Sequence, residues 1–118
     1  MKLIYISLKI DSAFHSQVLE LLNYFSSTNS FESITLIVAC DLIELKKYNL
    51  DKLNNINIIQ IKTYPQLPFY LSLTKKTVTK AFKKLDINHN TIIHTRNEYA
   101  GHVAHHALVN FNISHNNL

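Results

Sequence analysis

The residues with the greatest chemical potential lie in the stretch IIHTRNEYAGHVAHHAL, residues 92–108. This stretch holds four of the seven histidines, the only arginine and the only glycine of the chain. A histidine can accept a proton from a hydroxyl near neutral pH, and an arginine can hold a carboxylate or a phosphate through two parallel hydrogen bonds. The stretch could therefore form a metal site, a ligand-binding loop, or a strand followed by a helix that carries histidines.

The first half of this stretch has the residue types of a binding loop. His94 ends a short apolar run, and a polar connection leads from it into a helical segment. A polar strand end followed by a helix N-terminus suits an oxygen-rich anionic ligand. We take His94, Arg96, Asn97 and Glu98 as candidate binding residues, and we assign no catalytic residue. In a purely structural alternative, His94 is a half-buried strand residue and Arg96 pairs with Glu98 or another surface carboxylate.

The second half of the stretch has one feature of a metal site. His102 and His106 are four residues apart, so they share a helical face, as pairs of histidine ligands do. The glutamate of an H-E-x-x-H motif is absent, and the single cysteine, Cys40, excludes a cysteine-rich zinc site. We therefore expect no metal, and we expect His102, His105 and His106 on the solvent side of a helix. The small residue Gly101 would let a ligand or a neighbouring element approach the backbone.

The rest of the chain alternates between two patterns. Short apolar segments occur at 2–8, 33–39, 56–62 and 91–95, and segments with helical spacing lie between and after them, the last at about 99–109. This alternation predicts one α/β domain over residues 1–118, a three-layer αβα Rossmann-like sandwich. The sheet is expected to be mainly parallel, with four to five strands buried on both faces. FNI at 111–113 could open the fifth strand.

Ligands of such sheets bind beyond the carboxyl ends of the strands. Asp11, Ser12 and His15 follow the first strand, so they join the candidate binding residues. A chain with one glycine cannot contain the G-x-G-x-x-G loop of dinucleotide-binding domains or a P-loop, and no G-x-S-x-G motif is present. We therefore expect no cofactor.

The net charge of +4 is concentrated in LTKKTVTKAFKK, residues 73–84. This amphipathic segment could contact an anionic membrane surface through Lys76, Lys80, Lys83 and Lys84, bind an acidic partner, or present a solvated face. We expect no nucleic acid as partner. Nothing resembles a signal peptide and no segment is long enough to cross a bilayer. The expected location is the cytoplasm, with peripheral contact at the inner membrane surface.

The order of elements and the stretch from Ile92 to Leu108 resemble the N-terminal domain of a GT-B-type retaining glycosyltransferase (group 1, family 4-like). Members have an apolar strand ending in a turn of the form I-H-x-R, followed by a helix of small residues. The matching residues here are Ile92, Ile93, His94, Thr95, Arg96, Ala100, Gly101, Ala104, Ala107 and Leu108. The opening segment KLIYISL and the helix HSQVLELLNYF also fit the first strand and helix of the family.

The resemblance implies the acceptor-side half of an enzyme that transfers a sugar from a nucleotide-sugar donor. By position, His94, Arg96 and residues 11–15 would line the cleft and contact a carbohydrate or lipid-linked acceptor. The usual glycine-rich first loop is replaced by KIDSAFHS, and no donor-binding C-terminal domain follows. We therefore expect a truncated chain that is inactive alone and that self-associates through an exposed sheet edge. The alternative is a stand-alone flavodoxin-like binding or interaction module without catalysis.

Overall fold

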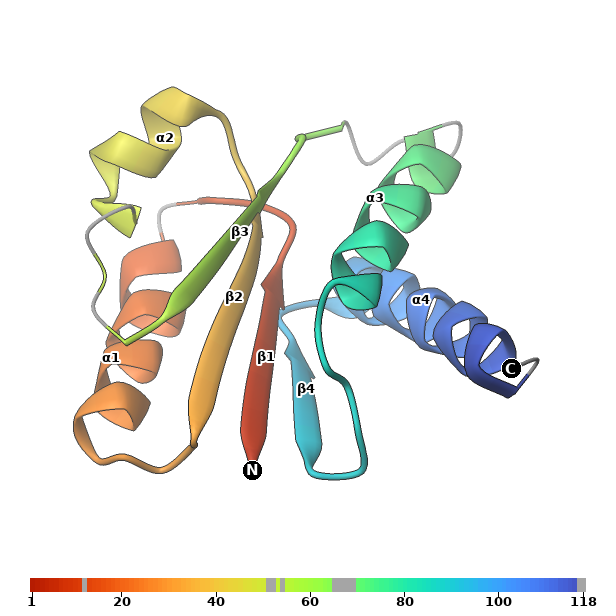
Figure 1. Ribbon diagram of the computed structural model, residues 1–118. Coiled ribbons are helices and arrows are strands. Elements are labelled where there is room, and N and C mark those ends of the chain that lie inside the picture. The colour runs from red at the N-terminus through yellow and green to blue at the C-terminus, as the bar shows by residue number, and fades with distance from the viewer. Residues whose placement is uncertain (12, 51–52, 54, 65–69, 117–118) are drawn as a thin grey trace.

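The computed structural model describes residues 1–11, 13–50, 53, 55–64 and 70–116, without the side chains of Glu98 and residues 110–116. Its strands are β1 (Lys2–Ser7), β2 (Ser33–Ala39), β3 (Asn57–Ile61) and β4 (Thr91–Thr95). A π-helical turn, η1 (His15–Leu19), runs directly into α1 (Glu20–Ser27). The remaining helices are α2 (Leu42–Lys47), α3 (Leu71–Lys83) and α4 (Glu98–Asn116) (Figure 1).

The four strands form one parallel sheet in the order β3-β2-β1-β4. The first crossovers place η1, α1 and α2 on one face, and the long crossover from β3 to β4 places α3 on the other face with α4. This arrangement confirms the predicted α/β three-layer Rossmann-like sandwich. The strand order is that of the Rossmann fold, whereas flavodoxin-like domains have β1 between β2 and β3.

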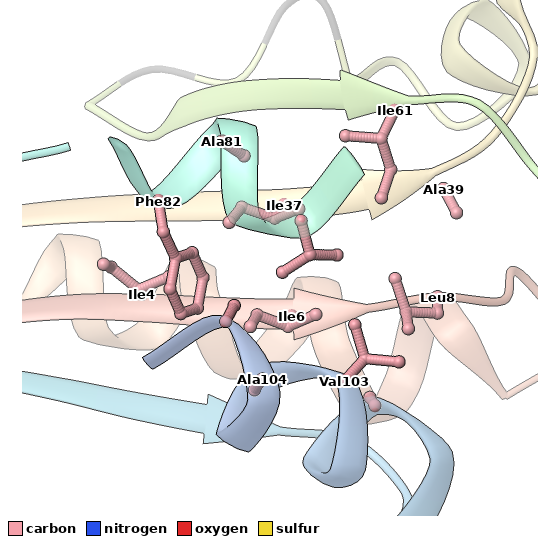
Figure 2. Close-up of a cluster of buried hydrophobic side chains, with 13 residues drawn as sticks. Ile4, Ile6, Leu8, Ile37, Ala39, Ile61, Ala81, Phe82, Val103 and Ala104 are labelled. Carbon is pink, nitrogen blue, oxygen red and sulfur yellow. The ribbon is translucent and has the colours of Figure 1, made fainter. Parts of the chain in front are cut away.

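Two apolar cores, one on each face, hold the layers together. Between the sheet and α3–α4, branched residues of the strands pack against small and aromatic residues of the helices (Figure 2). Figure 2 shows Ile4 of β1 beside Phe82 of α3, and Ile6 of β1 between Phe82 and Val103 of α4. The second core contains Leu3, Tyr5, Phe14, Val18, Leu19, Leu22, Ile34, Leu36, Val38, Cys40, Leu50 and Ile56.

Burial separates the central strands from the edge strands. Except for the first residue of each, every residue of β1 and β2 is buried, as the continuous apolar runs predict. β3 and β4 are only half-buried, with Ile92 43% exposed. The expectation of strands buried on both faces was therefore wrong for β3 and β4, because they lie at the edges of the sheet, where the helices cover less of each strand.

The end of the chain differs from the expectation. Helix α4 runs to Asn116, so residues 111–113 continue a helix and do not open a fifth strand. β-branched and aromatic residues raise strand propensity only weakly, and the helix already in progress extends through them. Among the described residues the sheet has four strands.

Candidate functional site

The strand order creates a topological switch point between β1 and β4. These neighbouring strands leave the sheet in opposite directions, β1 toward η1 and α1 and β4 toward α4. In open parallel sheets the crevice between two such diverging loops is the usual place for a ligand. The candidate residues after β1 and after β4 were identified separately in the sequence, and the fold brings Asp11 and Arg96 into contact at this switch point, with Asn97 next to Arg96 in the chain.

Arg96 joins the chain after β4 to the segment after β1. Its backbone N–H donates to the Ile6 carbonyl at 3.2 Å, which extends the β1–β4 pairing by one residue. Its guanidinium donates to the Lys9 carbonyl at 3.2 Å, to Asp11 Oδ1 at 2.7 Å and to Gln17 Oε1 at 3.1 Å. The side chain of Arg96 is only 10% exposed. Arg96 therefore pairs with a carboxylate, as the structural alternative anticipated, but the partner is Asp11.

Asp11 receives hydrogen bonds from two directions. Its Oδ1 accepts from Arg96 and from the Ala13 backbone N–H at 3.1 Å, which fixes the first turn of the loop after β1. The hydrogen bond from Arg96 holds the pKa of the Asp11 carboxyl below its ordinary value, and the charge of Arg96 acts in the same direction. Asp11 is thus ionised at neutral pH and neutralised by its partner. Ser12, the next candidate, lies outside the described residues.

Asn97 and Gly101 shape the start of α4. The Asn97 side-chain oxygen accepts from the Ala100 N–H at 2.8 Å, so Asn97 acts as the N-cap of the helix. A Cβ added at Gly101 would lie 3.3 Å from Thr95 Oγ1, so the glycine permits close approach of the helix to the end of β4. That neighbouring element, rather than a ligand, accounts for the glycine. The side chain of Glu98 lies outside the described part of the chain.

His94 points to the open face of the edge strand. Its side chain is exposed, and its ring stacks on the ring of Tyr5 with centroids 4.7 Å apart and an interplanar angle of 28°. The register of β1 and β4 places the two residues directly opposite each other. Burial raises the pKa of the Tyr5 phenol, and the charge of Arg96 partly opposes that rise. The exposed His94 ring thus lies at the surface and is held from beneath by the buried ring of Tyr5.

His15 does not join this group. It begins η1 with an exposed side chain, and its Nδ1 lies 3.8 Å from Glu20 Oε1 of the same helical segment. Two residues that sequence reasoning missed, Tyr5 and Gln17, do contact the candidates. Tyr5 was hidden in an apolar strand, and only the pairing of β1 with β4 reveals its contact with His94. The sequence around Gln17 does not indicate its contact, because its partner, Arg96, is 79 residues away.

Other hollows lie away from the switch point. One, of about 830 Å³, lies beyond the ends of β2 and β3 and is bordered by the exposed side chains of Leu42 and Ile43. Another, of about 400 Å³, is lined by lysines of α3 and by His106 of α4. Lys84 lies outside this second hollow, while Lys76, Lys80 and Lys83 line it. Membrane contact through these lysines stays a prediction, and no helix in the described residues is long and apolar enough to cross a membrane.

Of the other histidines of α4, His106 is half-buried and lines the hollow between α3 and α4, which differs from the solvent-facing position expected for it. His102 and His105 are exposed, while Val103, Ala104 and Ala107 are buried. Within the described ranges, no group of histidine, cysteine and acidic residues is arranged to hold a metal ion. Cys40 is buried, and burial raises the pKa of its thiol to about 11, with further contributions from the charges of Glu44 and Asp41.

Comparison of the chain with models of protein families, with curated proteins and with solved structures found no match.

Proposed function

We propose that this chain is the acceptor-side half of a glycosyltransferase of the GT-B type. In this proposal the switch point between β1 and β4 lines one wall of a cleft, and a second domain binds the nucleotide-sugar donor. The chain by itself lacks activity, because it forms only one wall of the cleft. The observation that carries the proposal is that Asp11, Arg96, Asn97 and the exposed ring of His94 lie together at the β1–β4 switch point of a Rossmann-type sheet.

The residues at this edge suit carbohydrate binding. A sugar ring presents hydroxyls at its rim and apolar C–H groups on its faces. The exposed imidazole of His94, held in place by stacking on the buried Tyr5 ring, offers an aromatic surface to a ring face and can donate to or accept from a hydroxyl. His94 therefore binds or polarises an acceptor hydroxyl, and a retaining transfer does not require it as a base.

Arg96 has a supporting role in this proposal. Its guanidinium is already engaged by Lys9, Asp11 and Gln17, so it fixes the shape of the crevice wall. A wall that is held rigid before a ligand arrives loses less conformational entropy on binding. Asn97 fixes the first turn of α4 in the same way. The acceptor then contacts a preformed edge made by the ends of β1 and β4.

Calorimetric titration of the chain with UDP-sugars tests whether donor binding belongs to the other domain. The proposal predicts weak binding or none, because the groups that hold the donor belong to the other domain. Tight binding of a UDP-sugar by this chain alone would contradict the proposal. Titration with UDP alone is the control, since a nucleotide pocket in this chain would bind both.

The second candidate is a stand-alone binding module without catalysis. It is favoured by one observation, the engagement of Arg96 in an internal network, which is what a purely structural arginine shows. The coding sequence downstream of the Leu118 codon separates the two candidates. A reading frame with a donor-site motif of two glutamates eight positions apart supports the transferase, and an ordinary intergenic region supports the module.

A further inference from the structure

The groove between α3 and α4 has one sign of charge along its whole length. Side chains of Lys75, Lys76, Lys80 and Lys83 line it from α3, and His106 lines it from α4. Its volume of about 400 Å³ falls in the range of small-molecule sites in proteins. None of these residues belongs to the switch point, so a ligand of the groove would be independent of the proposed function.

Packing fixes the lysines in this arrangement. The opposite side of α3 is buried, with Thr74, Val78, Ala81 and Phe82 in contact with the rest of the fold. Figure 1 shows α3 and α4 side by side, so one flank of α3 lies next to α4. The α3 residues that lie between these buried positions in the sequence therefore form one stripe on the other side of the helix. The buried side of α3 fixes the orientation of the helix, and the lysines therefore lie along the groove.

No acidic side chain offsets this charge within α3. The sequence from Leu71 to Lys83 contains no aspartate or glutamate, and in the described part of the chain no carboxylate forms an ion pair with the lysines of the groove. Lysines three or four residues apart on a helix repel one another. The helix dipole favours Lys80 and Lys83 in the last turn, but it does not favour Lys75 and Lys76. The charge of Lys75 and Lys76 is thus offset neither by the helix dipole nor by an ion pair within the described residues.

We propose that the α3–α4 groove binds a phosphate group, either a diphosphate or a phosphate monoester. Lysine ammonium groups are compact charges that bind phosphate oxygens through charge-assisted hydrogen bonds. The hydroxyl of Ser72 and the Oγ1 of Thr79 also border the groove and can share in its hydrogen bonding. A multiply charged phosphate would relieve the repulsion among the lysines, so binding would be coupled to the stability of α3.

An NMR titration of the ¹⁵N-labelled chain with inorganic pyrophosphate tests the proposal. The expected result is saturable shifts confined to the amides of α3 and the His106 region, with weaker affinity for inorganic phosphate. The double variant Lys76→Gln, Lys80→Gln should bind pyrophosphate at least about tenfold more weakly, because it loses two charge-assisted contacts. The matched control Lys46→Gln, Lys47→Gln removes the same charge from the exposed end of α2 and should retain the affinity.

Vesicle flotation separates a free phosphate from a lipid headgroup. Binding to phosphatidylglycerol vesicles that pyrophosphate displaces identifies a headgroup, and pyrophosphate binding without vesicle binding identifies a soluble phosphate. The proposal is overturned if shifts do not saturate, if both double variants weaken binding equally, or if vesicle binding resists pyrophosphate. Circular dichroism of both variants verifies the fold, and Lys80→Arg, which keeps the charge, should retain most of the affinity.

Discussion

The guanidinium of Arg96 donates a 2.7 Å hydrogen bond to the carboxylate of Asp11, 85 residues earlier in the chain. This contact ties the loop after the first strand to the loop after the last strand of the sheet. It also lies at the switch point where the two loops diverge. The same pair therefore links the two segments that follow β1 and β4, and it forms part of the wall of the proposed cleft.

Replacement of Arg96 by lysine should destabilise the domain. A lysine keeps the charge but cannot reach Lys9, Asp11 and Gln17 with one planar group, so the expected loss in free energy of unfolding is about 2 kcal/mol. Urea denaturation followed by circular dichroism measures the loss. Gln17→Ala removes a single acceptor and should cost less than Arg96→Lys. Equal stability of Arg96→Lys and the wild type would show that the network does not support the fold.

Asp11 should make the stability of the domain depend on pH. Its folded-state pKa lies below the unfolded value, so its contribution is fully present above the ordinary carboxyl pKa, about 3.9, and is lost as the pH falls through the folded-state pKa. The stability difference between wild type and Asp11→Asn should therefore be largest at neutral pH and shrink below about pH 4.

Urea denaturation at a series of pH values from 7 to about 3 measures that difference. The matched control is Asp86→Asn, which removes a carboxylate whose side chain is 84% exposed and which pairs with the Lys2 ammonium group. A difference between wild type and Asp11→Asn that stayed constant over the whole range would contradict the role given to Arg96.

Cys40 should react slowly in the native protein. It is 2% exposed, and its thiol pKa is raised from 9.0 to about 11. At pH 8 the higher pKa alone lowers the thiolate fraction about a hundredfold, and burial lowers access further. Stopped-flow reaction with a disulfide reagent, in buffer and in concentrated urea, measures the ratio of rates. Similar rates in both solutions would place the thiol at the surface.

The edge strand β4 should mediate the predicted self-association. Ile92 is 43% exposed on its open face, and β4 pairs with only one neighbour in the described sheet. Ile92→Lys should shift the association equilibrium toward the monomer in sedimentation experiments. Ile43→Lys, at a residue that is 78% exposed on α2, is the control and should leave the equilibrium unchanged. A wild-type protein that is monomeric at all concentrations would refute the prediction.

The sequence was sufficient to predict the architecture. The isoleucine-rich segments and the helical stripes between them gave the strands almost residue by residue, with 33–39 and 91–95 matching β2 and β4. The helical end of the chain could not be predicted in this way. FNI has the composition of a strand, and only the continuation of α4 determines its conformation.

The candidate site was predicted in part. Arg96, Asn97 and Asp11 were selected because they follow strands; Arg96 and Asp11 meet at the switch point, and Asn97 caps α4 beside them. Their partners could not be predicted, because the order of the strands decides which loops meet. Once β4 lies beside β1, the contacts of Arg96 with Asp11 and Gln17 and of His94 with Tyr5 become possible.

The most direct test of the proposed role is to map where carbohydrates bind. In this experiment, ¹H–¹⁵N spectra of the chain are recorded during titration with soluble oligosaccharide acceptors. His94→Ala is the test variant, and His89→Ala, at an exposed residue before β4, is the control. The exposed His94 ring should bind the sugar, so His94→Ala should weaken binding and His89→Ala should not.

The account predicts saturable shifts at residues 9–15 and 94–101 that disappear in His94→Ala and persist in His89→Ala. Shifts that map elsewhere, or that survive in His94→Ala, would contradict the assignment of the β1–β4 switch point as the acceptor wall.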